Sequence, residues 1–365
     1  MKFNTVKKMT ALMLAGVLAA GFTGCGSSAP AEKAASEAEA ASENAEETAE
    51  ATEEAAEESD AELTEFDVVL DWYPNAIHTF LYDAIDKGYF AEEGLKVNLI
   101  DPAESVDGLN FVATGRAQVG LTYMLEICQA KENGMPVKAL ASVCQRELDC
   151  LTSLASNEGI TEDMSCLKGK KVGFSGATSE EAIIRTIAEN NGLTTDDYEM
   201  VNVGFDLSTS LTTESVDLVT GMFINDEIIT LRNEGYDINV YDQLEYGIPQ
   251  MYGLVMAVND EDYEANTEQY EGFLRACAKG FEDMKADEDA ALEIIMRDMN
   301  SDENPLDETQ QRGSYETLME RMELPDAPFL SMSRELWQNT IDWMVKYELI
   351  SDSLTPEDVT ISLAD

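Results

Sequence analysis

The stretch FDVVLDWYPNAIHTFLYDAIDKGYFAEEGLKVNLI, residues 66–100, decides the fold class of this chain. Residues 66–71 form a short apolar strand pattern, and the turn residues Pro74 and Asn75 follow it. Apolar residues then recur at helical spacing as far as Gly88, and a second strand pattern lies at 95–100. A strand, a helix and a strand in this order indicate a βαβ unit.

The same alternation continues along the chain. Further strand patterns lie at 117–121 and 137–143, with helical patterns between them. The alternation restarts at 167–174 and continues through strand patterns near 200–203, 215–222 and 238–241. We therefore predict an α/β protein whose mainly parallel sheets are covered by helices on both faces.

The order of these segments predicts two lobes. A strand-like run at 251–258 follows the second set of strands, and a continuously helical segment then extends through Trp343, with Trp337 and Trp343 packed on the first lobe. We predict that residues 66–152 and 254–365 form lobe 1, that residues 153–253 form lobe 2, and that two crossover strands join them. This topology places the carboxyl ends of both sets of strands at a shared cleft, where ligands of open α/β sheets bind.

The charge balance argues against a nucleic-acid-binding protein. The chain has 73 Asp+Glu and 23 Lys+Arg, a formal net charge of −50, whereas phosphate contacts need clustered Lys and Arg. Residues 25–65 are rich in Ala, Glu, Ser and Thr and offer no apolar face, which predicts a charged, extended tether. An acidic interaction tail is the alternative.

The first 24 residues have the layout of a secretory signal. Three lysines precede an apolar run at 9–20, which is too short for a membrane-spanning helix. The sequence FTGC at 22–25 resembles a bacterial lipobox, although Phe22 stands where Leu is usual. That resemblance implies lipidation of Cys25 and stable attachment to the membrane through its acyl chains. An ordinary cleaved signal with an incidental Cys is the alternative.

Several motifs together resemble the NMT1/THI5-like family, in its branch that binds thiamine pyrimidine precursors. The motifs are LDWYPNAIH at 70–78, KGYFAEEGL at 87–95, GFSGATSEEA at 173–182, GMFINDE at 221–227 and PQMY at 249–252. The resemblance implies a type II periplasmic-binding fold and a monomeric, extracytoplasmic, non-catalytic receptor without metal or cofactor. Such a receptor delivers a hydroxymethyl- or formylaminopyrimidine to the permease and ATPase of an ABC importer.

The resemblance also assigns candidate ligand contacts. A flat nitrogenous ring needs an aromatic face, which Trp72 can supply, and hydrogen-bonding groups in its plane. Glu180 lies at a helix N-terminus, where the helix dipole favours the ionised carboxylate that would accept the exocyclic amine. The complete set is Trp72, Asn75, His78, Tyr123, Glu180, Asn225, Glu227 and Tyr252.

All of these residues except Glu180 also have a purely structural interpretation. For Trp72 it is closing the core under the first helix, and for Asn75 it is helix capping. His78 is the only His of the chain, and a lone His is more often a satisfied structural residue than a ligand contact. The structural interpretation of the remaining four residues is packing between the lobes or hydrogen bonding at the hinge. These four are Tyr123, Asn225, Glu227 and Tyr252.

Two other functions remain open at this point. Fungal relatives in the resembled family are enzymes that make the pyrimidine from a protein His and a pyridoxal cofactor with iron, and they carry clustered Cys where this chain has PQMY at 249–252. A receptor for sulfonate, nitrate or riboflavin is the other alternative. Anion sites need Arg or backbone amides, whereas the motif residues here are aromatic, amide or acidic. Cys144 and Cys150 either meet across a turn or stay reduced.

Overall fold

The computed structural model describes residues 63–103, 107–302 and 304–363. The predicted signal segment, Cys25 and the predicted tether as far as residue 62 lie outside these residues. Strand β1 (Thr64–Val69) begins two residues inside the segment 25–65 that was predicted as tether. The folded body therefore begins slightly earlier in the sequence than the predicted boundary.

Lobe 1 is built on a mixed sheet with the strand order β2-β1-β3-β10-β4. Its strands are β1, β2 (Leu95–Ile100), β3 (Val119–Thr122), β4 (Val137–Cys144) and β10 (Leu254–Asn259). β1 pairs in parallel with β2 and β3, whereas β10 runs antiparallel to β3 and β4. The sheet is mixed because β10 brings the chain back from lobe 2 in the opposite direction.

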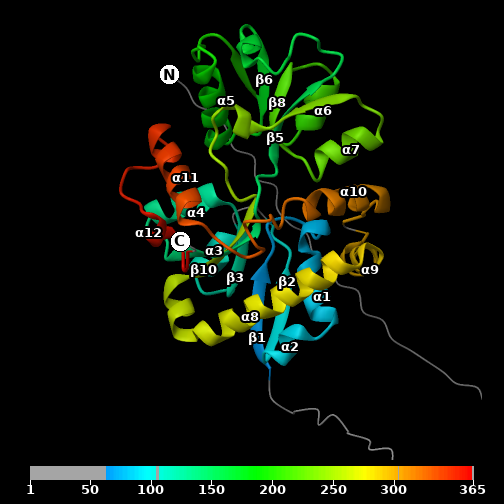
Figure 1. The fold of residues 1–365 in the computed structure, drawn as a ribbon, viewed down its shortest axis with the longest axis vertical. Coiled ribbons are helices and arrows are strands. Elements are labelled where there is room, and N and C mark those ends of the chain that lie inside the picture. Colours follow the sequence, from blue (N-terminus) through cyan, green and yellow to red (C-terminus); the bar gives the residue numbers. More distant parts are fainter. Residues whose placement is uncertain (1–62, 104–106, 303, 364–365) are drawn as a thin grey trace, which may run out of the picture. The chain divides into compact units, whose positions relative to one another are not determined.

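Helices cover both faces of this first sheet. The phenyl ring of Phe66 in β1 stacks on Phe273 of α8 with 4.9 Å between centroids, and α8 crosses the first sheet in Figure 1. Gly88 adopts φ 75°, which ends α1 and starts the turn into α2. The short helices of this part of lobe 1 are η1 (Ala76–His78), α1 (Thr79–Asp86), α2 (Tyr89–Glu92), α3 (Asp107–Ala113) and α4 (Met124–Glu132).

Lobe 2 is built on a second mixed sheet, with the strand order β7-β6-β8-β5-β9. Its strands are β5 (Asp149–Leu154), β6 (Lys171–Phe174), β7 (Glu199–Asn202), β8 (Leu218–Phe223) and β9 (Ile238–Tyr241). β5 runs antiparallel to β8 and β9, while β6 is parallel to β7 and β8. The predicted boundary after residue 152 falls inside β5, so residues 149–152 belong to the second sheet and not to lobe 1.

The remaining elements of lobe 2 are helical. The short 3-10 turn η2 (Met164–Leu167) precedes β6, and η3 (Gln243–Tyr246) lies in the return connection between β9 and β10. The α-helices are α5 (Thr178–Asn190), α6 (Leu207–Thr212) and α7 (Glu227–Asn233). The chain thus passes between the two sheets after β4 and again after β9.

The C-terminal segment was predicted to be continuously helical through Trp343, but the structure shows that its helices are interrupted. Nonhelical stretches at 300–302, 304–307 and 320–333 contain Pro305, Pro325 and Pro328, and proline cannot continue a helix. The helical parts are α8 (Asp260–Ala286), α9 (Glu288–Ile294), the π-helical turn η4 (Ile295–Met299), α10 (Glu308–Met319), α11 (Arg334–Lys346) and α12 (Pro356–Val359).

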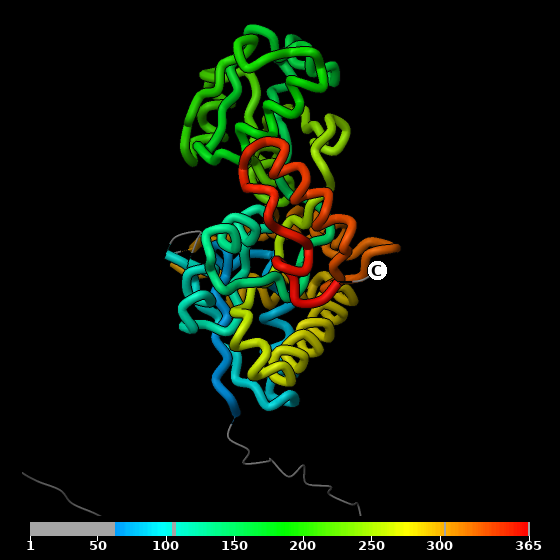
Figure 2. The backbone as a smooth tube through the Cα atoms, turned by 90° about the vertical axis from the view of Figure 1, so that its left-hand side faces the viewer, coloured from blue at the N-terminus to red at the C-terminus, as the bar shows by residue number. Residues whose placement is uncertain are grey.

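Helix α11 also contacts lobe 2, contrary to the expectation that its tryptophans pack on lobe 1 alone. The indole N–H of Trp343 donates to Thr186 Oγ1 at 3.0 Å, and Arg185 Nη2 donates to the carbonyl of Tyr347 at 2.9 Å. Both Thr186 and Arg185 lie on α5. Trp337 is fully buried in an apolar cluster that includes residues of both lobes. The red C-terminal segment in Figure 2 therefore forms a third link between the lobes.

The cysteines in the described part of the chain are free thiols. Cys144 ends β4 and its thiol donates to the carbonyl of Arg146 at 3.2 Å. Cys150 lies in β5 of the other sheet, where its thiol donates to the carbonyl of Met222 at 3.2 Å. The two residues do not meet across the turn. Within the described ranges, no helix is long and apolar enough to span a bilayer.

Candidate functional site

A pocket of about 480 Å³ opens between the two lobes at the end of β1. Lobe 1 supplies residues 72–75 and one side of α10, and lobe 2 supplies Asn225, Asp226 and part of α7. Gln310 Nε2 on α10 donates to Asp226 Oδ1 at 2.6 Å, which joins the two walls. The pocket thus lies where β1 and β8 end, which is the usual ligand position in open α/β sheets.

Trp72 lies on the wall of this pocket and is 46% exposed. Its indole meets Tyr73 edge-on, with 5.6 Å between ring centroids. The alternative in which Trp72 closes the core under the first helix is therefore wrong. An aromatic face is available to a ligand at this edge of lobe 1.

Asn75 lines the same pocket, but its side chain is engaged in local structure. The amide oxygen accepts from Ile77 N at 3.1 Å and caps η1, and the amide nitrogen donates to the carbonyl of Tyr73 at 3.0 Å. A ligand would have to replace one of these hydrogen bonds. In this structure Asn75 is therefore a helix cap, as its structural interpretation predicted.

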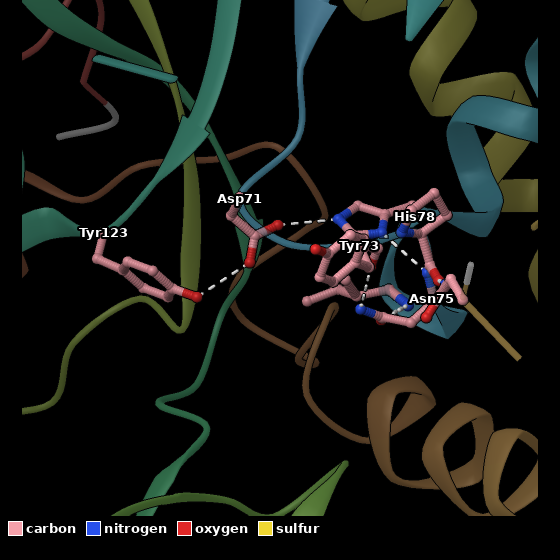
Figure 3. A network of polar contacts seen from close by, with 8 residues as sticks. Asp71, Tyr73, Asn75, His78 and Tyr123 are labelled. Carbon is pink, nitrogen blue, oxygen red and sulfur yellow. Dashed lines mark hydrogen bonds and ion pairs between the residues drawn. The ribbon is translucent and has the colours of Figure 1, made fainter. Parts of the chain in front are cut away.

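His78 is fully buried and both of its ring nitrogens have partners, as Figure 3 shows. Nδ1 lies 3.2 Å from the backbone N–H of Asn75 and accepts from it, so the ring proton resides on Nε2. Nε2 lies 2.8 Å from Asp71 Oδ1 and donates to it. His78 holds the turn after β1 and presents no free nitrogen to the pocket.

Asp71 connects His78 to Tyr123 and was not among the predicted site residues. The Tyr123 hydroxyl donates to Asp71 Oδ2 at 2.9 Å. Burial raises the pKa of this carboxyl, but the hydrogen bond from His78, together with that from the Tyr123 hydroxyl, outweighs burial and leaves the pKa below its usual value. Burial, followed by the Asp71 charge, raises the pKa of Tyr123 well above its usual value. Asp71 is the last residue of the strand pattern 66–71, and an acid at that carboxyl end was a signal that could have identified it.

Glu180 is 8% exposed and lies in the first turn of α5 in lobe 2. Its Oε2 accepts from Ser175 N at 2.8 Å and from Ser175 Oγ at 2.7 Å. Burial raises the pKa of Glu180 despite these bonds, contrary to the expectation that the helix N-terminus keeps it readily ionised. A Cβ on Gly221 would collide with Glu180 Oε1, so only glycine fits beside this carboxyl.

Asn225 is 5% exposed and lines the pocket. Its buried amide oxygen has no hydrogen-bond partner among the described residues. A buried acceptor without a donor is uncommon in folded proteins and carries a free-energy cost. A ligand N–H or O–H reaching this oxygen would remove that cost.

Glu227 lies next to the pocket but is not one of the residues that line it. Its Oε2 accepts from the backbone N–H of Phe223 at 2.9 Å. Burial, followed by the charge of Asp226, raises the pKa of Glu227 to about 7. Its carboxyl closes the turn that leads from β8 into α7.

Tyr252 does not face the pocket, although a contact with the ligand ring was predicted. It is 3% exposed, its hydroxyl accepts from Ser333 N at 2.6 Å, and its ring centroid lies 6.3 Å from that of Trp337. The N-terminal end of α11 contacts the phenol through Ser333 and Trp337. Tyr252 therefore belongs to the packing between the lobes.

Phe205 is a residue that the sequence analysis missed. It lies in lobe 2 between β7 and α6 and is 90% exposed. Its ring centroid lies 6.4 Å from that of Trp72 across the gap between the lobes, at an interplanar angle of 40°. No local pattern distinguishes such a loop aromatic from a core residue, so the sequence alone offered no signal for it.

Comparison with known proteins assigns the family. The model of the family described as NMT1/THI5 like matches residues 75–291. The chain belongs to this family. It is 34% identical over 306 residues to the formylaminopyrimidine-binding protein of Halalkalibacterium halodurans, a match that covers 84% of this chain and 92% of the relative. The family resemblance inferred from the motifs is confirmed.

The relatives of this chain include enzymes as well as binding proteins. The chain is 28% identical over 233 residues to the 4-amino-5-hydroxymethyl-2-methylpyrimidine phosphate synthase of Aspergillus parasiticus, covering 61% of this chain and 67% of the enzyme. Among solved structures, the periplasmic aliphatic sulphonate binding protein SsuA of Escherichia coli aligns with a TM-score of 0.65 and 13% identity, over 82% of this chain and 93% of SsuA. This likeness confirms the predicted periplasmic-binding fold.

Proposed function

We propose that this chain is the extracytoplasmic solute-binding component of an ABC importer and binds a thiamine-related pyrimidine, formylaminopyrimidine or hydroxymethylpyrimidine, between its lobes. The observation that carries the proposal is that the half-exposed Trp72 and Asn225, whose buried amide oxygen is unpaired, line one pocket in a chain 34% identical to a formylaminopyrimidine-binding protein. Closure of the two lobes about their hinge would then enclose the ligand.

Trp72 and Asn225 together match the chemistry of an aminopyrimidine. The indole provides a flat apolar face, and stacking of this kind contributes about 0.5–1.5 kcal/mol beyond the burial of surface. The exocyclic amine of the ligand is a donor, and Asn225 Oδ1 is a buried acceptor that lacks one. A hydrogen bond there contributes about 0.5–1.5 kcal/mol and also removes the cost of the unpaired oxygen.

The charges around the pocket favour a donor-rich ring over an anion. The lining residues include the acids Asp226, Glu234 and Asp307, and none of the described lining residues is Lys or Arg. A sulfonate or nitrate needs Arg or converging backbone amides. We therefore rank the pyrimidine above the sulfonate and nitrate alternatives.

Binding is tested by titration calorimetry and thermal shift with formylaminopyrimidine, hydroxymethylpyrimidine, riboflavin, an alkanesulfonate and nitrate. A ligand present at 100 times its Kd should stabilise the native protein by about 2.7 kcal/mol. Trp72→Ala should weaken pyrimidine binding about ten-fold or more, whereas Trp72→Phe keeps an aromatic face and should retain most of it. Absence of any response to either pyrimidine at millimolar concentration would refute the proposal.

We further infer that the chain is a receptor and not a synthase. The side chain of His78 is sealed in the core with both nitrogens bonded, so no nitrogen is free to react, and PQMY stands at 249–252 where the enzymes carry clustered Cys. Incubation with pyridoxal phosphate and ferrous iron in air, followed by mass spectrometry, should show no pyrimidine phosphate. Formation of that product would reverse the inference.

We propose that residues 1–24 are a signal that is removed, and that a lipid on Cys25 anchors the mature monomer to the membrane. The acidic segment that follows would hold the lobes away from the bilayer, where a permease and its ATPase receive the ligand. Mass spectrometry of the membrane fraction should find a lipidated N-terminal Cys25, and Cys25→Ala should remain unprocessed or leave the membrane fraction. A mature N-terminus other than Cys25 would contradict the anchor.

A further inference from the structure

Phe205 is the most exposed of the large apolar side chains in the described part of the chain. It is 90% exposed, whereas the other exposed large apolar residues range from Leu63 at 37% to Tyr73 at 47%. Apolar side chains stabilise a fold by leaving water, so Phe205 contributes little to the stability of lobe 2 in this conformation. Its presence at this position calls for a partner that lobe 2 itself does not provide.

The backbone around Phe205 holds the ring in a defined position. Asp206 N donates to the carbonyl of Val203 at 3.2 Å, which makes residues 203–206 a tight turn. Gly204 adopts φ 57° and donates its N–H to Asn202 Oδ1 at 3.0 Å. Phe205 therefore projects from the tip of a hydrogen-bonded turn at the end of β7.

The ring that Phe205 faces is the indole of Trp72, which belongs to lobe 1. The two centroids lie 6.4 Å apart and the planes are tilted by 40°. A flat ring held between two others needs roughly 7–8 Å between the outer centroids, twice the carbon contact distance of about 3.5–4.0 Å. The present 6.4 Å is too short for this, so the lobes must rotate slightly apart before the two side chains form a slot for one planar ring.

We propose that Phe205 is the second aromatic face of the ligand site, carried by lobe 2 onto the ring that stacks on Trp72. This inference rests on the proposed function, since the guest is the pyrimidine. The ligand then links the two lobes, because one of its faces contacts Trp72 of lobe 1 and the other contacts Phe205 of lobe 2. A ligand must enter while the two rings are farther apart, and Phe205 contacts it only when the lobes then come together, so Phe205 slows dissociation more than it changes association.

The proposal is tested with full-length protein by stopped-flow binding of formylaminopyrimidine to the wild type, Phe205→Ala and Phe205→Leu. Phe205→Ala should raise Kd about ten-fold, mostly through the dissociation rate, and Phe205→Leu should have an intermediate effect. Tyr236→Ala removes another aromatic of lobe 2, one that is 39% exposed and, among the described ring contacts, has none with Trp72, and it should leave the kinetics unchanged.

Acrylamide quenching gives a second measurement that locates the ligand. Of the three tryptophans, Trp337 and Trp343 are 0% and 6% exposed, so quenching reports mainly on Trp72. Bound ligand should shield Trp72 in the wild type and shield it less in Phe205→Ala. The double variant Trp72→Ala/Phe205→Ala should lose less affinity than the two single losses combined, because both residues hold one ring.

The outcomes separate this inference from the proposed function. If the wild type binds the pyrimidine and Phe205→Ala keeps the same Kd, dissociation rate and shielding of Trp72, the second face is wrong and the proposed function stands. If the wild type does not bind, both are overturned. An unchanged melting temperature of unliganded Phe205→Ala, expected for so exposed a residue, excludes misfolding as the cause of weaker binding.

Discussion

Replacing Glu227 with Gln should stabilise the protein in mildly alkaline solution and have little effect in mildly acidic solution. Glu227 is the first residue of α7, and its Oε2 accepts from Phe223 N at 2.9 Å. Gln keeps an acceptor oxygen and nearly the same shape. It lacks the carboxylate charge, which burial and the neighbouring Asp226 both disfavour.

The magnitude follows from the pKa of Glu227, which rises from 4.5 to about 7 on folding. Because the folded protein binds this proton more tightly than the unfolded chain, the stabilisation is complete below pH 4.5 and is lost as the pH rises through about 7. Each pKa unit corresponds to about 1.4 kcal/mol, so the full loss is about 3 kcal/mol. Water still reaches this half-buried side chain and screens its charge, and we therefore expect Glu227→Gln to gain about 2 kcal/mol.

The free energy of unfolding should be measured in urea at about pH 4.5 and about pH 8.5, on either side of this titration. Glu264→Gln is the matched control, because Glu264 is exposed and its replacement removes the same charge from a strongly acidic protein. The gain of Glu227→Gln over this control should appear only at the higher pH. An equal gain at both pH values would refute the pKa argument.

Three further substitutions test particular contacts. His78→Phe should destabilise the protein by about 3–5 kcal/mol in urea unfolding, because it leaves the buried Asp71 carboxylate without its main donor; a loss under about 1 kcal/mol would contradict this role. Gln310→Ala removes the hydrogen bond to Asp226 and should increase the radius of gyration of the unliganded protein in X-ray scattering, whereas an unchanged radius would show that this contact does not hold the lobes together. Gly221→Ala should cost about 2 kcal/mol or more in urea unfolding, since φ is 95° and a Cβ collides with a buried carboxyl; wild-type stability would disprove the collision.

The βαβ unit could be predicted because its signals are local. The predicted strand 95–100 coincides with β2, and Gly88 ends α1 with the positive φ that glycine allows. Strand β5 was missed because only a short stretch separates it from β4. An apolar run does not show which sheet it joins, since that depends on pairing with β8 and β9, far along the chain.

The candidate site could be predicted only in part, for a related reason. The motif placed Trp72 and Asn225 directly after strands, and the pocket lies at the ends of those strands. Tyr252 also adjoins a strand, but α11 covers it through Ser333 and Trp337, which follow about eighty residues later in the sequence. Phe205 faces Trp72 only because two separate sheets are brought together, and no short sequence pattern encodes that approach.

The links between the lobes are of two kinds, and their positions constrain how the cleft can open. Away from the pocket, α11 is tied to α5 by the bonds of Trp343 to Thr186 and of Arg185 to Tyr347, within a shared apolar cluster. At the pocket, the walls meet through the polar contact of Gln310 with Asp226 and through one apolar contact, of Ile229 with Gly313. A polar bond exchanges readily with water, whereas separating apolar surfaces exposes them to it. Rotation of the lobes should therefore pivot near α11 and open on the side of Trp72, which is the side where a ligand must enter.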